Sequence, residues 1–292
     1  MKPRGLRLGN KIILIVLFLI ALTTLYPFVH VLMYSLSDSK QAMTGWLFLW
    51  PHGFSLNAYR ILFQTRQIYV AYGNSLFVTG VGTLISLILT VLLAYPLSVR
   101  RLRGRGAVAV FCFISLLFNG GMIPTFLQVQ RLGLLDTRWA LILPGCISAY
   151  NMFLVRNYML SIPASLEESA AIDGASPMRV LISIIVPLSK PVIAAVGLFY
   201  AVNYWNSYLR AVLYTNTQSL EILQQFLRRM MAAGSAVGAM GDASDFSSLS
   251  SSLSEESIKM ATITASILPV LIVYPWLQKY YVKGLTLGAV KE

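Results

Sequence analysis

Charged and reactive residue types are scarce in this sequence of 292 residues. Only 12% of the residues are Asp, Glu, Lys or Arg, and there are two cysteines and two histidines. Cys112 and Cys146 lie inside apolar runs without the spacing of metal ligands, and His30 and His52 also lack such spacing. The sequence contains no G-x-x-x-x-G-K-[ST] phosphate-binding loop and no pattern of a catalytic triad. We therefore expect no metal site, no catalytic residues and no ATP hydrolysis in the chain itself.

Apolar residues, in contrast, are abundant. They make up 57% of the sequence, and the mean hydropathy is +0.68, well outside the range of soluble proteins. The net charge of +12 does not indicate a nucleic-acid partner, because the basic residues are dispersed between apolar runs. The basic cluster at 100–105, between two such runs, is typical of a cytoplasmic loop. The composition predicts an all-α, polytopic membrane protein in contact with lipid.

Six apolar runs are long enough to cross a hydrocarbon core of about 30 Å. A cleaved signal peptide is the alternative for the first run, but the run is long for one and no cleavage site follows it. We expect one membrane domain, 1–292, with a loop at 161–190 and a long outer loop at 215–257. The six expected transmembrane helices cover approximately residues 11–36, 73–99, 107–129, 139–160, 191–214 and 258–281.

The basic residues also predict the orientation of the chain. Most of the 23 Lys and Arg residues fall on the side that holds the two termini, the 100–105 cluster and the 161–190 loop. Because loops on the cytoplasmic side of a membrane carry the excess of Lys and Arg, both termini and this loop are expected in the cytoplasm.

The 161–190 loop has the punctuation of two short helices. Ser165 and Glu168 fit a capping box at the start of the first helix. Gly174 then supplies a left-handed residue, so this helix is expected to end at about Asp173.

The second helix is expected to begin at Ser176, which serves as its cap, with Pro177 at the first helical position. Pro187 and Pro191 should limit its length. The result is a helix-turn-helix between two membrane spans.

One side of the first helix is small or apolar. Leu166, Ala170, Asp173 and Gly174 recur at i, i+4, i+7 and i+8. Such a surface suits insertion into the cleft of another protein. The alternative is an amphipathic loop that packs on its own helix bundle.

The loop resembles the EAA loop of ATP-binding-cassette importer permeases. That pattern is Glu-Ala-Ala, three residues, Gly, nine residues, Ile-x-Leu-Pro, and the match extends over about 20 residues with fixed spacing. Ser169 replaces the first Ala and Val186 replaces the Leu. The resemblance implies that the loop docks on a cytoplasmic ATPase and transmits its motion to the membrane. The residues implied in this coupling are Glu168, Ser169, Ala170, Asp173, Gly174 and Pro187.

The resemblance extends to segments 119–126, 139–144 and 274–284, which look like a carbohydrate-importer branch that includes permeases for uronate-containing oligosaccharides and for alginate. It implies a multi-pass protein of the bacterial inner membrane that works with a second homologous permease. It further implies two ATPase subunits that bind ATP and Mg²⁺, an extracytoplasmic solute-binding protein, and an acidic, alginate-like saccharide as substrate. No cofactor is implied in this chain.

Polar residues inside the apolar runs are the candidates for the solute pathway. Asn119 precedes two glycines and Pro124, and such broken helices often line transport paths, although close helix packing is the alternative. Asn203, Asn206 and Arg210 are expected on one face of the fifth span. They would line the pathway or form hydrogen bonds between helices, and Arg210 would alternatively extend to the outer membrane surface.

Two other classes of function compete with an importer permease. An ion-coupled secondary transporter should show inverted repeats and intramembrane carboxylates, yet no repeat is evident and the Asp and Glu residues lie outside the expected spans. A membrane-embedded enzyme would need a catalytic constellation, which the sequence lacks. The importer permease is therefore the favoured interpretation.

Overall fold

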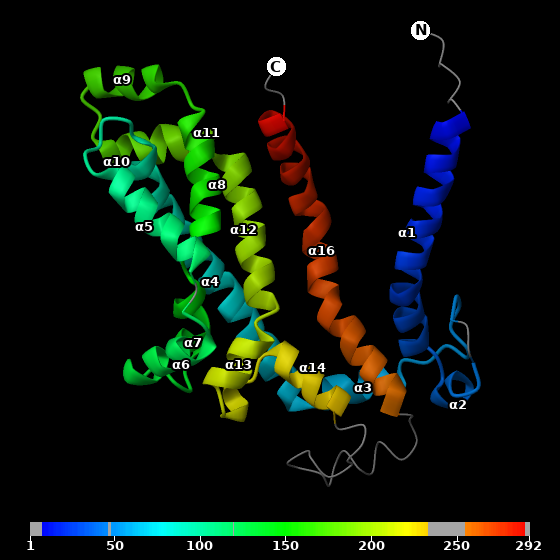
Figure 1. Ribbon diagram of the computed structural model, residues 1–292. Helices are drawn as coiled ribbons and strands as arrows, with labels where there is room; N and C mark the ends of the chain where they lie inside the picture. The colour runs from blue at the N-terminus through cyan, green and yellow to red at the C-terminus, as the bar shows by residue number, and fades with distance from the viewer. Residues whose placement is uncertain (1–7, 46–47, 119, 233–254, 290–292) are drawn as a thin grey trace. The chain divides into compact units, whose positions relative to one another are not determined.

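The chain is built of α-helices. The computed structural model describes residues 8–45, 48–118, 120–232 and 255–289 (Figure 1). Within these ranges, the one β pairing outside the helices is an isolated bridge between Ser37 and Phe54. The predicted all-α class is therefore confirmed.

The chain divides into two compact units, which are described separately. The first comprises residues 1–68 and 227–268, and the second comprises residues 69–226 and 269–292. The expectation of a single membrane domain therefore stays a prediction. Helices α4, α14 and α16 each contribute to both units.

The first unit contains α1 (Leu8–Ser35), α2 (Ser39–Ala42), α3 (Asn57–Gln64) and part of α16 (Glu255–Ala289). Residues 11–25 of α1 are almost all apolar and are exposed, as a lipid-facing helix would be. The end of α1 is held by hydrogen bonds: Ser35 Oγ lies 2.7 Å from the Tyr59 hydroxyl. Ser39 Oγ lies 3.1 Å from Ser257 Oγ at the start of α16.

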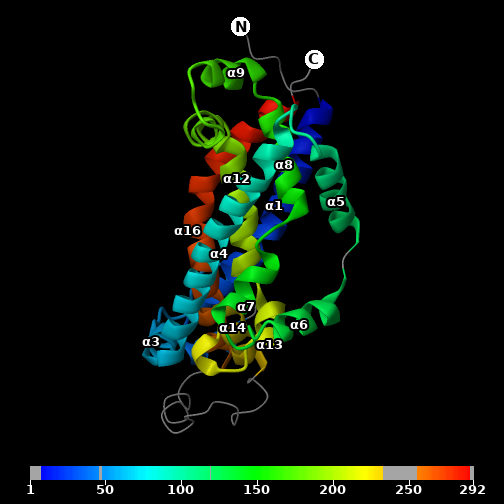
Figure 2. The ribbon, with the colours of Figure 1, turned by 90° about the vertical axis from the view of Figure 1, so that its left-hand side faces the viewer.

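The second unit contains most of the remaining helices. The helix α9 lies at one pole of this unit, whereas α6, α7 and α13 lie at the other (Figures 1 and 2). Its helices are α4 (Arg66–Ser98), α5 (Arg105–Leu117), α6 (Met122–Arg131), α7 (Arg138–Ile142), α8 (Ala149–Leu160), α9 (Ala164–Ile172), α10 (Pro177–Val180), α11 (Val186–Leu188), α12 (Lys190–Trp205), α13 (Tyr208–Tyr214) and part of α14 (Leu223–Ala232).

The helices agree in part with the expected spans. Two are individually long and apolar enough to cross a membrane, Lys11–Ser35 and Arg66–Ser98, and three bent helix pairs bring the number to five at most within the described residues. Six spans therefore stay a prediction. The helix α4 begins at Arg66, earlier than the expected start at 73.

One predicted interruption is confirmed, and a second break, near Pro144, was not predicted. The chain leaves the helix between α5 and α6, where Gly121 adopts a φ of +89°, a conformation that glycine tolerates. Near Pro144, a short 3₁₀ turn at Leu143–Gly145 separates α7 from α8, and the two halves are bent by 51°. A break inside an apolar run frees backbone groups that must find partners elsewhere in the protein.

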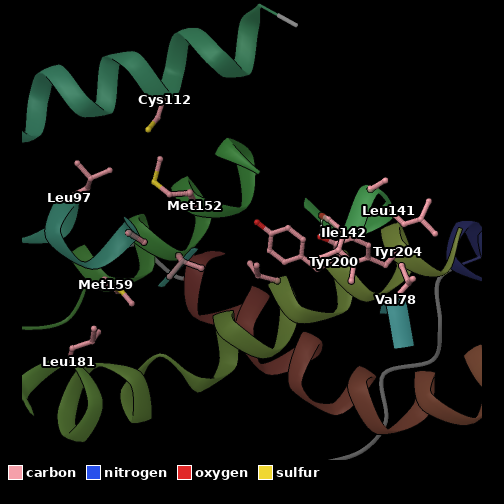
Figure 3. Packing of buried hydrophobic residues seen from close by; sticks show 14 of the residues in the cluster. Val78, Leu97, Cys112, Leu141, Ile142, Met152, Met159, Leu181, Tyr200 and Tyr204 are labelled. Carbon is pink, nitrogen blue, oxygen red and sulfur yellow. Dashed lines mark hydrogen bonds between the residues drawn. The ribbon is translucent and has the colours of Figure 1, made fainter. Parts of the chain in front are cut away.

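The core of the second unit lies between α4, α8, α12 and the break that separates α7 from α8. Figure 3 shows Tyr200 and Tyr204 close to Leu141 and Ile142, with Met152 near Cys112 farther along the unit. Both tyrosines are almost completely buried. Cys112 is a small buried residue here, as the sequence indicates.

Candidate coupling loop and polar helix break

The first helix of the loop, α9, begins earlier than predicted. Its N-cap is Pro163, whose carbonyl accepts from the Leu166 amide at 3.2 Å. Ser165 lies inside the first turn, so the predicted capping box of Ser165 and Glu168 is wrong. Proline brings a fixed φ and no N–H that needs a partner, which makes it suitable for a helix start. Glu168 is therefore left exposed rather than engaged as a cap.

The end of α9 has the predicted geometry. Gly174 adopts a φ of +79°, and its amide donates to the Ala171 carbonyl at 3.1 Å. The Ala175 amide donates to the Ala170 carbonyl at 2.9 Å. These two bonds form a Schellman motif, in which the left-handed residue lets the chain reverse while satisfying the last carbonyls. Asp173 is the C-cap, as expected.

The second helix starts as predicted but ends differently. The Ser176 hydroxyl accepts from the Arg179 amide at 3.3 Å, and Pro177 occupies the first turn. The helix widens into a π segment at Leu181–Ile185 and continues through Pro187 to Leu188. Pro187 therefore does not end the helix. Proline has no N–H to donate to the preceding turn, and the wider π turn accommodates Pro187 within the helix. The chain turns instead at Ser189, where 177–188 and α12 are bent by 82°.

Five large apolar side chains of the loop are exposed, three of them on α9 and α10 and two farther along, Ile182 and Leu188. Ile172 is 87% exposed, Met178 53% and Leu166 41%. We call these three residues the docking surface. Glu168, Ser169, Asp173 and Pro187 are also exposed, but Ala170, which was expected on the same face as Leu166, is buried against its own chain.

The buried side of α9 identifies which acidic residue faces inward. Glu167 is half-buried and interacts electrostatically with the Tyr95 hydroxyl, as does Arg101, three residues beyond the end of α4. Ile172, two residues beyond Ala170, lies about 200° around the helix from it. Ile172 was not among the predicted coupling residues. The signal that would have found it is an apolar residue opposite the small buried face of α9.

The predicted polar stripe is brought together by a helix break rather than by one helix. The helix α12 ends at Trp205, Asn206 is its C-cap, and α13 starts at Tyr208. The continuous fifth span at 191–214 was therefore wrong. Arg210 Nη2 nevertheless donates to the Asn203 carbonyl at 3.0 Å and to Asn203 Oδ1 at 2.7 Å.

This contact has a clear physical role at the end of α12. The last carbonyls of a helix have no partner within it, and a basic side chain nearby can supply the hydrogen bond. Arg210 also lies over the Tyr204 ring, with its Cζ 5.0 Å from the ring centroid. Asn206 is exposed beside the break, and Asn119 lies outside the described residues.

Tyr204 links this break to the one near Pro144. Its hydroxyl donates to the Ile142 carbonyl at 3.0 Å and lies 2.9 Å from Ser86 Oγ on α4. One buried side chain thus joins three helices and satisfies a carbonyl that the break has freed.

Tyr200, one turn earlier on α12, makes the matching contact on the other side of the break. Its hydroxyl accepts from the Ser148 amide at 3.0 Å and lies 2.8 Å from Thr90 Oγ1. The two tyrosines therefore fix α4 and α12 to both ends of the bend between α7 and α8.

The partners on α4 belong to a stripe of hydroxyl residues that the sequence analysis missed. Thr79, Thr83, Ser86 and Thr90 recur at i, i+4, i+7 and i+11, which is one face of a helix. The hydroxyls of Thr79 and Thr83 are buried without a hydrogen-bond partner in the described part of the chain. The regular spacing of hydroxyl residues within an apolar run was the available signal.

Two glycines on α4 allow a test of how closely α4 packs against Tyr204. A Cβ added at Gly82 would lie 2.9 Å from the Tyr204 ring, whereas one at Gly80 would meet nothing within 4 Å among the described residues. Since small residues let membrane helices approach closely, we expect Gly82→Ala to lower the thermal unfolding midpoint of the purified permease. Gly80→Ala, the matched control, should leave it unchanged or raise it. Equal midpoints for the two variants would contradict this packing.

An acidic residue fixes the loop at the same pole as α6 and α13. Asp136, whose φ is +57°, accepts hydrogen bonds from the Asn216 and Thr217 amides, both at 3.0 Å, and from the Thr217 hydroxyl. These hydrogen bonds, the side-chain one most, lower the pKa of Asp136 below its usual value. The carboxylate is therefore charged at neutral pH, and its contribution is lost only as the pH falls through the lowered pKa.

The chain is similar to known transport proteins over almost its whole length. A structure described as a bacterial ABC transporter involved in the import of the acidic polysaccharide alginate contains a chain that matches with a TM-score of 0.87 and 34% identity, over 96% of this chain and 100% of that chain. The polygalacturonan/rhamnogalacturonan transport system permease protein YtcP of Bacillus subtilis (strain 168) is 45% identical over 98% of this chain and 99% of its own. Protein LplC of the same organism is 41% identical over 92% of this chain and 90% of its own.

A family model covers nearly the whole chain. It matches residues 12–287 and is described as the inner membrane component of a binding-protein-dependent transport system. The matched residues include the 161–190 loop, both helix breaks and the hydroxyl stripe of α4. The chain therefore belongs to the family of inner membrane components of binding-protein-dependent transport systems.

Proposed function

We propose that this permease component imports an acidic saccharide and that its 161–190 loop transmits the motion of a cytoplasmic ATPase. The observation that carries the proposal is the similarity, at a TM-score of 0.87 and 34% identity over almost the whole chain, to a transporter of an acidic polysaccharide. YtcP, whose name refers to polygalacturonan and rhamnogalacturonan, supports the same class of substrate. Permeases of this family are not enzymes, and the ATPase is a separate subunit.

The docking surface supports the role of the loop. Ile172, the most exposed of its three apolar residues, lies on a short helix whose end is fixed by the Gly174 turn. An exposed isoleucine on a rigid helix can fill a hydrophobic groove of a partner with little loss of conformational freedom. Glu168 and Asp173, exposed beside it, can form ion pairs with basic residues at the rim.

The remaining partners follow from this assignment. The chain works with a second homologous permease, two ATPase subunits that bind ATP and Mg²⁺, and an extracytoplasmic solute-binding protein. The solute pathway passes Asn203, Asn206 and Arg210 at the α12–α13 break, and Asn119 between α5 and α6. The chain itself needs no cofactor.

Substrate-stimulated ATP hydrolysis tests the function. The complex is purified with its partner subunits, reconstituted in lipid vesicles and supplied with its binding protein. Oligogalacturonates or alginate oligosaccharides should stimulate hydrolysis, whereas neutral maltooligosaccharides of equal length should not. Stimulation by the neutral sugars alone would refute an acidic substrate.

The orientation predicts which introduced cysteines react from outside. In a variant without Cys112 and Cys146, a cysteine at Ser176, an exposed residue of the coupling loop, should be shielded from an impermeant thiol reagent in intact cells. A cysteine at Leu132, which is 61% exposed beyond α6, should react. Both sites should react after the cells are opened. Labelling of the Ser176 site in intact cells would reverse the proposed orientation.

A further inference from the structure

The guanidinium of Arg210 carries a positive charge that its own chain does not neutralise. Its contacts are the two oxygens of Asn203 and the ring of Tyr204. Among the described residues, no carboxylate pairs with this arginine. A cation that is partly removed from water is usually paired, so an unpaired one at a solute pathway is a candidate for binding an anion.

Part of the guanidinium remains available to such an anion. An arginine has five N–H donors, two on each Nη and one on Nε. Both hydrogen bonds to Asn203 come from Nη2, so within the described chain the donors of Nη1 and Nε have no recorded acceptor. Arg210 is half-buried, so part of its side chain remains exposed.

The position of the guanidinium depends on a glycine in the neighbouring helix break. A Cβ added at Gly145 would lie 2.3 Å from Arg210 Nη1 and 3.5 Å from its Cζ. A methyl group at this position would therefore displace the guanidinium from its place against the backbone. Asn203 holds the guanidinium from α12, and Gly145 leaves room for it beside the 3₁₀ turn.

These contacts define one arrangement built from two helix breaks. Resting on the proposed import of an acidic saccharide, we propose that Arg210 recognises a carboxylate of the passing sugar through its Nη1 and Nε donors. Gly145 and Asn203 are positioning residues that hold the guanidinium for this contact. The break near Pro144 thereby contributes to the selection of charge as well as to the course of the helix.

Paired substrates isolate this role. The complex, reconstituted with its binding protein, is given tri-galacturonate or the methyl ester of the same trisaccharide, and ATP hydrolysis and uptake are measured. The ratio of acid to ester is compared between the wild type and Arg210→Gln, Arg210→Lys and Gly145→Ala. The control is Arg131→Gln, since Arg131 is an exposed arginine at the end of α6. Because one binding protein serves all variants, a change in the ratio originates in the permease.

The variants should separate charge from position. Arg210→Gln should lower the acid-to-ester ratio roughly tenfold, because it removes a charge-assisted hydrogen bond that only the acid can accept. Gly145→Ala, which keeps the arginine but displaces it, should lower the ratio by a smaller factor. Arg210→Lys should retain part of the preference, and Arg131→Gln should retain all of it.

Two results would overturn the proposal and can be told apart. If the wild type prefers the acid and Arg210→Gln keeps the wild-type ratio, Arg210 does not recognise the carboxylate, although the acidic substrate stands. If the wild type does not prefer the acid, the proposed substrate class fails together with this inference. A general loss of folding is recognised because transport of the ester would fall equally with transport of the acid.

Discussion

Ile172→Glu is expected to abolish substrate-stimulated ATP hydrolysis in the assembled importer. Ile172 is 87% exposed and is the most exposed residue of the docking surface. Burying an isoleucine side chain in a partner contributes about 1.5–3 kcal/mol, and placing a carboxylate in the same groove adds a desolvation penalty. The ATPase should therefore bind at least tenfold more weakly, since each 1.4 kcal/mol is a factor of ten. Co-purification of the ATPase and stimulated hydrolysis are the measurements.

Two controls show whether the effect is local. Ile172→Leu keeps an apolar side chain of similar volume and should retain most of the coupling. Leu132→Glu introduces the same charge at another exposed apolar residue, the C-cap of α6, and should leave ATPase binding intact. The helix α6 lies at the pole of the second unit opposite to α9 (Figure 1). Normal stimulation in Ile172→Glu would remove this residue from the docking surface.

Gly174→Ala is expected to lower coupling through the backbone alone. A Cβ at Gly174 would meet nothing within 4 Å in the described chain, so the substitution causes no clash within this subunit. The φ of +79° is nevertheless costly for alanine, by about 1 kcal/mol or more. The strain would weaken the Schellman turn and let the end of α9 depart from its position. Stimulated hydrolysis should fall several-fold while membrane insertion stays normal.

The choice of side chain separates strain from bulk. Gly174→Asn should have a smaller effect than Gly174→Ala, because asparagine tolerates the left-handed conformation better. Gly174→Leu should have the largest effect, because it combines strain with bulk beside the partner. If Ala and Asn were equally tolerated, a left-handed residue at this position would not be needed for coupling.

The helix ends of the loop could be predicted from the sequence better than its exposed residues could. Gly174 and the pair Ser176 and Pro177 act within a few residues of themselves, so their roles could be read directly. The capping box at Ser165 failed because Pro163 offered an earlier helix start. Ile172 was missed because exposure depends on which side of α9 packs against the rest of the chain. That choice is made by tertiary contacts such as the burial of Ala170.

The break between α12 and α13 also depends on contacts between distant parts of the chain, which the sequence does not reveal. The residues Asn203 and Arg210 were selected from helical spacing, yet they meet because α12 ends between them. Tyr200 and Tyr204 were not selected, because an aromatic residue in an apolar run gives no sign of which backbone groups its hydroxyl will reach. Their partners, such as the Ile142 carbonyl, are free only because of a break elsewhere in the chain.

Site-specific photo-crosslinking from position 172 tests the central claim most directly. A benzoylphenylalanine in place of Ile172 is irradiated in the assembled complex in membranes, and the same group at Leu132 serves as the control. We expect a covalent product between the permease and the ATPase subunit from position 172 and none from position 132. The absence of an ATPase product from position 172 in a complex that still co-purifies with its ATPase would contradict docking through this loop.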